Sequence, residues 1–221
     1  MIRPIVIAID GPAGAGKSTI AKKVAESLQF IYIDTGAMYR AVTLEFLATG
    51  KAFSEELVSK IAEKINVTFK SEPNCNHVYI DGEEVTEKIR SSRVTQKVSQ
   101  VAAVVGVRKA LVEAQRELGA LGGVVMDGRD IGTVVFPKAE VKVYLTASVE
   151  ERAKRRYLEL KNKGQNIELE VLMQEIAQRD KFDSEREASP LCCAADAHYL
   201  DTSNLDINAV VAAILHLCKV I

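Results

Sequence analysis

The feature that most restricts the fold of this chain is a glycine-rich segment near its N-terminus, Gly11–Ser18. It reads G-P-A-G-A-G-K-S and fits the pattern G-x-x-x-x-G-K-[ST]. A continuous apolar run, Ile5–Ile9, precedes it, as in a parallel strand that is buried on both faces. Apolar residues then recur at helical spacing over Ser18–Leu28. A buried strand, this loop and an amphipathic helix in that order predict a site for the phosphates of a nucleoside triphosphate.

The residue types in the loop explain how it would hold phosphate. Glycines leave room for backbone N–H groups to turn towards phosphate oxygens, and the following helix adds the positive end of its dipole. Lys17 is expected to reach the β- and γ-phosphates, and the Ser18 hydroxyl is expected to bind Mg²⁺. The expected nucleotide-binding residues of the loop are Gly11, Pro12, Ala13, Gly14, Ala15, Gly16, Lys17, Ser18 and Thr19.

Length and charge limit the number of domains and the kinds of partner that this chain can have. The chain has 221 residues, which suits one domain or one domain with a small insert. Its net charge of −1 provides no basic field for nucleic acid, so any further anion site must come from local Arg and Lys clusters. No apolar stretch is long enough to span a membrane, and Ile5–Ile9 is too short for a signal peptide. We therefore expect a cytoplasmic protein that binds neither nucleic acid nor membranes.

Strands and helices alternate along most of the chain. The expected strands are Ile5–Ile9, Phe30–Ile33, Val124–Met126, Val141–Leu145 and His198–Leu200. Helices are expected over Ser18–Leu28, 36–48, 54–65, 91–118 with a break near Gly106, 148–163, 169–179 and 208–220. This alternation predicts an α/β fold with a doubly wound parallel sheet.

One segment departs from this alternation. Three short strands are expected there, over Val67–Lys70, His77–Ile80 and Glu83–Val85. Asp81-Gly82 between the last two is a hairpin-turn signal. We interpret the segment as a small β insert at one edge of the main domain.

Several classes of protein carry a phosphate loop, and the sequence distinguishes among them. A GTPase switch reads its base with N-K-x-D, but the nearest segment, Asn162-Lys163-Gly164-Gln165, lacks the acid. A switch should also carry D-x-x-G after its third strand, and Met126–Asp130 does not fit that pattern. A kinase is therefore favoured, and a nucleotide-binding regulator without an acceptor remains the alternative.

A small-molecule kinase needs a second anion site that faces the loop and holds the acceptor in line with the γ-phosphate. Arginine suits this role because its planar guanidinium binds phosphate through two hydrogen bonds. Arg40 follows the second expected strand and Arg129 the third, while Arg179 and Arg186 are further candidates. Ligands of such sheets bind beyond the carboxyl ends of the strands, so Arg40 and Arg129 are expected in the same crevice as Lys17.

Three more arginines, Arg152, Arg155 and Arg156, lie on the expected helix 148–163. Arg152 and Arg156 share one face of this helix because they are four residues apart. That face either is solvated or closes over the nucleotide, and the spacing alone does not decide between the two.

Four segments together resemble one family, the bacterial cytidylate kinases. They are Asp34–Arg40 (DTGAMYR), Ser99–Ala103 (SQVAA) with Arg108 further on, Asp127–Pro137 (DGRDIGTVVFP), and Arg179–Arg186 (RDKFDSER) followed by Ser189-Pro190-Leu191. They occur in order over almost the whole chain. The DGRDIGTVVFP run is highly specific, whereas the loop alone occurs in many unrelated proteins.

The resemblance implies a fold and a reaction. The fold would be the P-loop NTPase fold, with an adenylate-kinase-like sheet of five parallel strands in a single kinase domain, 1–221. Its core would be about 1–65 and 91–221, its insert on the monophosphate side about 66–90, and its short lid about 157–168. The reaction would be Mg²⁺-dependent transfer of the ATP γ-phosphate to CMP or dCMP in pyrimidine nucleotide metabolism, by a monomer. UMP, AMP or shikimate remain alternative acceptors.

The resemblance also assigns roles to matching positions. The loop Gly11–Thr19 would hold ATP, together with Arg156. The residues expected around CMP are Arg40, Arg129 and Arg186 at the phosphate, Thr35, Ser99, Arg108 and Asp130 at the cytosine, and Arg179 and Asp183 at the ribose. Lys17, Arg40, Arg129 and Arg186 would be the catalytic residues. Asp127 ends its strand near the loop, where it either orients Mg²⁺ through water or is a turn or capping acid.

Overall fold

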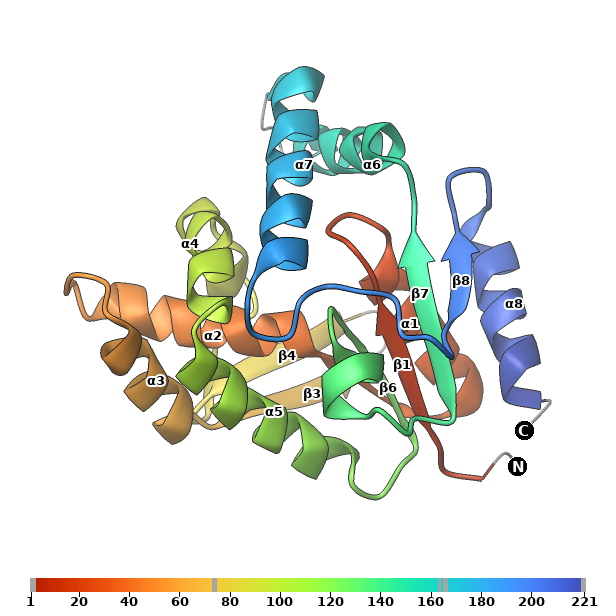
Figure 1. The fold of residues 1–221 in the computed structure, drawn as a ribbon, viewed down its shortest axis with the longest axis horizontal. Coiled ribbons are helices and arrows are strands. Elements are labelled where there is room, and N and C mark those ends of the chain that lie inside the picture. Colours follow the sequence, from red (N-terminus) through yellow and green to blue (C-terminus); the bar gives the residue numbers. More distant parts are fainter. Residues whose placement is uncertain (1–2, 73–74, 163, 165–166, 220–221) are drawn as a thin grey trace.

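The computed structural model of this protein describes residues 3–72, 75–162, 164 and 167–219. Three residues of the expected lid, 163, 165 and 166, lie outside the described residues, and so does Val220 at the expected end of the last helix. Figure 1 shows one twisted sheet with helices on both of its faces, and a group of helices to one side.

Five parallel strands form the central sheet in the order β2-β6-β1-β7-β8. Their bounds are β1 Val6–Asp10, β2 Ile31–Asp34, β6 Val124–Gly128, β7 Val141–Thr146 and β8 His198–Asp201. These strands confirm the α/β fold and the parallel sheet expected from the sequence. The register pairs Asp127 with both Ile9 and Asp34, so the carboxyl ends of three strands lie level. The chain leaves β1 towards β2 on one side and reaches β7 on the other, which makes the end of β1 a topological switch point.

Helices cover the sheet on both sides (Figure 1). One face packs against α1 (Lys17–Leu28) and α8 (Ile207–Lys219), and the other against α5 (Val105–Gly119) and the short π-helical turn η2 (Ile131–Val135). Successive side chains of β1 alternate between the two hydrophobic clusters, so all of its apolar residues are buried. The continuous apolar run in the sequence therefore reflects a strand with helices on both sides.

A second sheet is antiparallel and has the order β3-β4-β5. Its strands are β3 (Val67–Glu72), β4 (Cys75–Ile80) and β5 (Glu83–Glu84). Asp81 and Gly82 join the last two strands with φ values of 49° and 88°, the left-handed conformation that a two-residue hairpin turn requires. The hairpin expected from the Asp-Gly pair is confirmed.

Several short helices share a hydrophobic cluster with this small sheet. They are α2 (Thr35–Ala48), α3 (Glu55–Lys64), η1 (Lys88–Arg90) and α4 (Ser92–Ala102). Helix α2 begins where β2 ends, because the carboxylate of Asp34 accepts a hydrogen bond from the N–H of Ala37 at 3.0 Å. This cap places the first turn of α2 directly at the carboxyl edge of the central sheet.

The helical region 91–118 divides at residues 103–104, two positions before Gly106, so the break expected near this glycine is confirmed. Gly106 lies inside α5, where a Cβ atom would come within 2.2 Å of the Ser59 Oγ on α3. The glycine allows two helices to pack closely and does not itself end a helix. Glycine is a poor helix former, but close packing between α3 and α5 was the stronger requirement at this position.

The remaining two helices, α6 (Val149–Asn162) and α7 (Leu169–Glu185), pack against each other above the carboxyl edge of the sheet (Figure 1). Ser148 caps α6, since its Oγ accepts the N–H of Glu151 at 3.1 Å. Helix α7 extends beyond Arg179, the end expected from the sequence, so Arg179 and Asp183 lie on a regular helix and Arg186 follows as its C-cap. Within the described part of the chain, no helix has the length and apolar composition needed to cross a membrane.

Candidate active site

The glycine-rich loop connects β1 to α1 at the carboxyl edge of the central sheet. Gly11, Gly14 and Gly16 have positive φ values of 147°, 77° and 86°. At Gly11 a Cβ atom would lie 1.9 Å from the carbonyl oxygen of Leu145, so no side chain fits where the loop passes β7. The path of the loop therefore depends on glycine, as its sequence pattern predicts.

Lys17 is the first residue of α1, and its side chain is buried under the loop. Its Nζ donates a hydrogen bond to the carbonyl of Pro12 at 2.8 Å. Burial lowers the pKa of Lys17, and the charge of Arg129 lowers it further, although Asp127 and Asp10 oppose this. Because a bound anion raises the pKa of a nearby ammonium group, the buried lysine favours phosphate in the loop.

Arg152 of α6 supports the loop from above. It is only 4% exposed, and its Nη1 donates to the carbonyl of Ala13 at 3.0 Å and to the Asp180 carboxylate at 2.6 Å. Its Nε donates to the carbonyl of Ala147 at 2.8 Å. Arg152 thus joins the phosphate loop to both α6 and α7. The sequence left the role of this residue undecided, because helical spacing does not show which side of α6 faces the loop.

The two neighbouring arginines have different surroundings. Arg155 donates to the carbonyl of Thr202 at 2.9 Å and to Glu151 at 3.0 Å, so it ties α6 to the end of β8. Arg156, the lid residue expected at ATP, is half-buried and donates to Glu159 at 2.7 Å on its own helix. Its charge nevertheless contributes to the lowered pKa of Arg40 on the opposite side of the site.

This difference leads to a prediction for two substitutions on one helix. Arg152→Ala is expected to lower the free energy of unfolding by about 3 kcal/mol, because it removes a buried guanidinium and leaves Asp180 without its partner. Arg156→Ala removes a half-buried side chain that pairs with Glu159 on its own helix, and it is expected to change this free energy by less than about 0.5 kcal/mol. Urea denaturation of both variants measures the difference, and equal losses would contradict the bracing role of Arg152.

Asp127 is buried at the end of β6 and receives two hydroxyl groups. Ser18 Oγ donates to its Oδ2 at 3.1 Å, and Tyr32 Oη donates to its Oδ1 at 2.7 Å. Burial raises the pKa of Asp127 and the charge of Asp34 adds to this, while Lys17 and the two hydroxyls favour the ionised form. Ser18 and Asp127 therefore place two hard oxygen donors side by side at the loop, the ligand type that Mg²⁺ prefers. Both residues were expected from the sequence, whereas Tyr32 was not.

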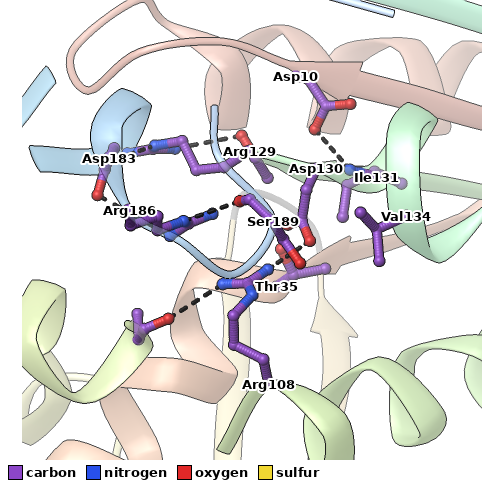
Figure 2. A network of polar contacts seen from close by, with 12 residues as sticks. Asp10, Thr35, Arg108, Arg129, Asp130, Ile131, Val134, Asp183, Arg186 and Ser189 are labelled. Carbon is purple, nitrogen blue, oxygen red and sulfur yellow. Dashed lines mark hydrogen bonds and ion pairs between the residues drawn. The ribbon is translucent and has the colours of Figure 1, made fainter. Parts of the chain in front are cut away.

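The arginines expected on the acceptor side form a cluster. We call Arg40 of α2, Arg129 after β6, Arg179 of α7 and Arg186 at the C-cap of α7 the arginine cluster. Arg129 Nε donates to Asp183 Oδ2 at 3.0 Å, and Arg186 Nη1 lies 4.0 Å from Asp183 Oδ1. Figure 2 shows Asp183 between these two guanidinium groups. One buried carboxylate thus holds two of the four arginines in place.

Positive charge is crowded in this cluster. Burial lowers the pKa of Arg179 to about 10, and the nearby charges of Arg129 and Arg40 act in the same direction. Burial also lowers the pKa of Arg40 to about 10, where Asp34 opposes the effect and Arg90 adds to it. Such mutual repulsion between desolvated cations is relieved by an anion bound among them.

Two N–H groups of the arginine cluster also indicate that an anion binds there. Within the described residues, Arg179 Nε and Arg186 Nη2 are buried and have no hydrogen-bond partner. Buried donors in folded proteins are almost always satisfied by protein, water or ligand. These donors are therefore suited to the oxygens of an anionic ligand that faces the phosphate loop.

Beside the arginine cluster lies a buried ion pair between Arg108 of α5 and Asp130. Both side chains are 4% exposed, and Arg108 Nη1 also donates to the carbonyl of Ala102 at 3.1 Å. Figure 2 shows Thr35 next to this pair, and its hydroxyl donates to the carbonyl of Asp127 at 2.7 Å. Ser99 is on the neighbouring helix α4 with a half-buried side chain. Thr35, Arg108 and Asp130, three of the residues expected at the cytosine, thus lie together, and Ser99 is on the adjoining helix.

Asp10 is a site residue that was not expected from the sequence. It ends β1, and its Oδ1 and Oδ2 accept the N–H groups of Ile131 and Gly132 at 2.8 and 2.7 Å. Figure 2 shows the contact with Ile131. The carboxylate joins the strand that carries the phosphate loop to the turn that follows Asp130. An acidic residue at the end of a buried strand was the available signal, but its partners are 121 and 122 residues away.

Asp10 gives a prediction for pH dependence. Burial raises its pKa to about 6, above the ordinary value of 3.8. The folded protein therefore binds this proton more tightly than the unfolded chain, so the contribution of Asp10 to stability falls as pH rises through this range. Relative to Asp10→Asn, the wild type is expected to gain about 1 kcal/mol of unfolding free energy from pH 7 to pH 5. Urea denaturation at a series of pH values measures this difference. If the unfolding free energies of the two proteins changed equally with pH, the raised pKa would be contradicted.

A phosphate loop that faces an arginine cluster across the carboxyl edge of a parallel sheet defines a P-loop kinase that acts on a small acceptor. Solved structures with a similar fold include a shikimate kinase from Bacteroides thetaiotaomicron, with a TM-score of 0.51, 15% identity, and coverage of 97% of this chain and 98% of that one. The sequence model of the cytidylate kinase family matches residues 7–220. The chain belongs to the cytidylate kinase family.

Curated relatives agree with this assignment. A cytidylate kinase of Bacillus velezensis is 51% identical over 220 residues, covering 99% of this chain and 98% of the relative. A cytidylate kinase of Lysinibacillus sphaericus is 53% identical over 222 residues, with the same coverage. A gluconokinase structure from Sinorhizobium meliloti shares the fold, with a TM-score of 0.51, 14% identity, and coverage of 100% of this chain and 95% of that one.

Proposed function

We propose that this protein transfers the γ-phosphoryl group of ATP to CMP or dCMP and releases ADP with CDP or dCDP. The observation that carries this proposal is the arginine cluster, which holds two buried N–H groups without a partner among the described residues. The charges of the cluster act on Lys17 on one side, and those of Arg108 and Asp130 act on Arg186 on the other. Membership of the cytidylate kinase family and the names of the curated relatives support the same acceptor. We further propose that the protein works as a monomer in the cytoplasm, as the resemblance to the family implies.

ATP would lie with its phosphates in the loop Gly11–Thr19, and Arg156 would approach it from the lid. The backbone N–H groups of the loop and Nζ of Lys17 would hold the β- and γ-phosphates. Ser18 would bind Mg²⁺ directly and Asp127 through water, which fits the adjacent oxygens of the two side chains. Bound there, Mg²⁺ would neutralise charge on the phosphate oxygens.

The phosphate of the acceptor would lie in the arginine cluster, with Arg40, Arg129 and Arg186 as its direct partners. Arg179 and Asp183 would be close to the ribose, where a carboxylate can accept hydrogen bonds from the hydroxyl groups. Asp183 is already fixed by Arg129, which keeps its orientation before the nucleotide arrives. Several rigid guanidinium groups from α2, α7 and the β6 turn would thus fix the direction of the attacking oxygen.

The base would be read by the buried pair. Cytosine offers an N4 amino donor, which the Asp130 carboxylate can accept, and O2 and N3 acceptors, which Arg108 can serve. Arg108 Nε is buried and has no hydrogen-bond partner among the described residues, so a donor is free for the base. Uracil presents a carbonyl oxygen in place of the amino group. This oxygen and the Asp130 carboxylate are both hydrogen-bond acceptors, so they would repel each other. Thr35 and Ser99 would complete the base pocket.

This chemistry needs no covalent intermediate on the protein and no general base, because the acceptor phosphate is already a nucleophile. Lys17, Arg40, Arg129 and Arg186 would stabilise the charge on the transferring group and keep the attacking and leaving oxygens in line. Closure of α6 and α7 over the site would exclude water, which otherwise competes as acceptor.

An ADP-release assay with a panel of acceptors tests the proposal. CMP and dCMP should give rapid turnover with ATP and Mg²⁺, and UMP, AMP and shikimate should give much less. Faster turnover with one of these three would replace CMP by that acceptor and retain a P-loop kinase. Nucleotide binding without turnover on any acceptor would instead indicate a nucleotide-binding regulator.

A further inference from the structure

The hydroxyl of Tyr32 on β2 is the second hydrogen-bond donor to Asp127. Tyr32 is 5% exposed, and its Oη donates to Asp127 Oδ1 at 2.7 Å, across the register of two neighbouring strands. Ser18 Oγ donates to the other oxygen, Oδ2, at 3.1 Å. The two oxygens of the carboxylate are therefore held by two different elements, of which only one belongs to the phosphate loop.

Packing alone does not require this hydroxyl. The ring of Tyr32 belongs to the hydrophobic cluster that also contains Val24 and Val125, where a phenylalanine would fill the same space. A buried phenol O–H must find an acceptor, and here the acceptor is the carboxylate beside the loop. The polar end of the side chain is thus directed at the proposed metal site and away from the cluster that holds the ring.

We propose that Tyr32 is a positioning residue for the carboxylate that holds the Mg²⁺ of bound ATP. The inference rests on the proposed function, in which Asp127 contacts Mg²⁺ through water. By occupying Oδ1, Tyr32 stops the carboxylate from rotating and leaves Oδ2 directed at Ser18 and at the water of the metal. If the carboxylate had only the Ser18 contact, it could rotate about the Cβ–Cγ bond of Asp127. Partners of this outer kind orient the groups around a metal and strengthen its binding.

The test is Tyr32→Phe, which keeps the ring and removes only the oxygen. Metal binding is measured without any acceptor, by titrating Mn²⁺ or Mg²⁺ into the protein loaded with a non-hydrolysable ATP analogue, with electron paramagnetic resonance or calorimetry as readout. We expect the metal to bind about tenfold more weakly. Affinity for the analogue in the presence of a chelator should stay within twofold of wild type. Tyr199→Phe is the matched control, because Tyr199 is 64% exposed on β8, and it should leave both affinities unchanged.

A double-mutant cycle separates positioning from simple structural support. In the Asp127→Asn background, Tyr32→Phe should have no further effect on metal affinity, because the group that it positions has lost its charge. Thermal unfolding and circular dichroism of each variant report any general loss of structure. A lower melting temperature with unchanged metal affinity overturns the proposal, and so does an equal loss of metal affinity in both backgrounds. Because no acceptor is present, failure of CMP turnover in the wild type would count against the proposed function and leave this result intact.

Discussion

Lys17→Ala is expected to lower kcat by about 10³-fold, because it removes a cation that acts mainly on the transition state. The side chain is buried under the loop, with Nζ 2.8 Å from the carbonyl of Pro12, so no exposed residue can replace it. Stability should fall much less than activity, since burial lowers the pKa of Lys17 and makes its charge costly in the folded protein. The free energy of unfolding of the variant should therefore stay close to that of the wild type.

Steady-state turnover at saturating ATP and CMP, together with urea denaturation, measures both parts of this prediction. Lys23→Ala is the control, because Lys23 is exposed on the same helix and should keep wild-type kinetics. Activity of Lys17→Ala near that of wild type would rule out a catalytic role for the lysine. A parallel loss of stability would show that the residue also supports the loop.

Asp130→Ala is expected to raise KM for CMP by about 10- to 100-fold while KM for ATP changes little. The carboxylate is the proposed acceptor for the N4 amino group of cytosine, and it lies on the acceptor side of the site. The substitution also leaves the Arg108 guanidinium buried without its partner, which is expected to cost about 3 kcal/mol or more of unfolding free energy. Kinetics with each substrate varied in turn separate the two effects.

The double variant Arg108→Met/Asp130→Leu distinguishes base reading from fold support. Apolar side chains of similar volume often replace a buried ion pair without loss of stability. We expect the double variant to recover most of the stability that Asp130→Ala loses, while KM for CMP stays high. Equal increases in KM for CMP and for ATP would contradict the base-reading role of Asp130. Recovery of CMP use in the double variant would do so as well.

The elements with strong local patterns could be predicted from the sequence. The five strands, the phosphate loop and the Asp81-Gly82 hairpin depend on residue type and spacing within a few positions, and all are confirmed. The helix break expected near Gly106 is confirmed at residues 103–104, although the glycine itself lies inside α5 and allows close packing against Ser59 on another helix. The end of α7 was placed too early because its last turns carry mostly charged residues that show no apolar periodicity.

The residues of the site also fall into two groups, those that could be predicted from the sequence and those that could not. Residues of long, specific motifs, such as Arg129 and Asp130, could be expected at the site from the sequence alone. Asp10, Tyr32 and Arg152 could not, because their roles depend on partners that are far away in the sequence. A buried strand can carry a polar residue for many reasons, and only the register of β1, β2 and β6 shows that Asp10 and Tyr32 face the site.

The crowding of guanidinium groups around the acceptor position makes the resting protein sensitive to the salts in which it is handled. Divalent oxyanions such as sulfate or inorganic phosphate can enter between cations that repel one another, and any solute that binds only the folded state raises the melting temperature. The same ions would then compete with the nucleotide for that position. Apparent affinities and melting temperatures measured in phosphate buffer would therefore describe a partly liganded protein, and a buffer of weakly binding anions such as chloride is the appropriate reference.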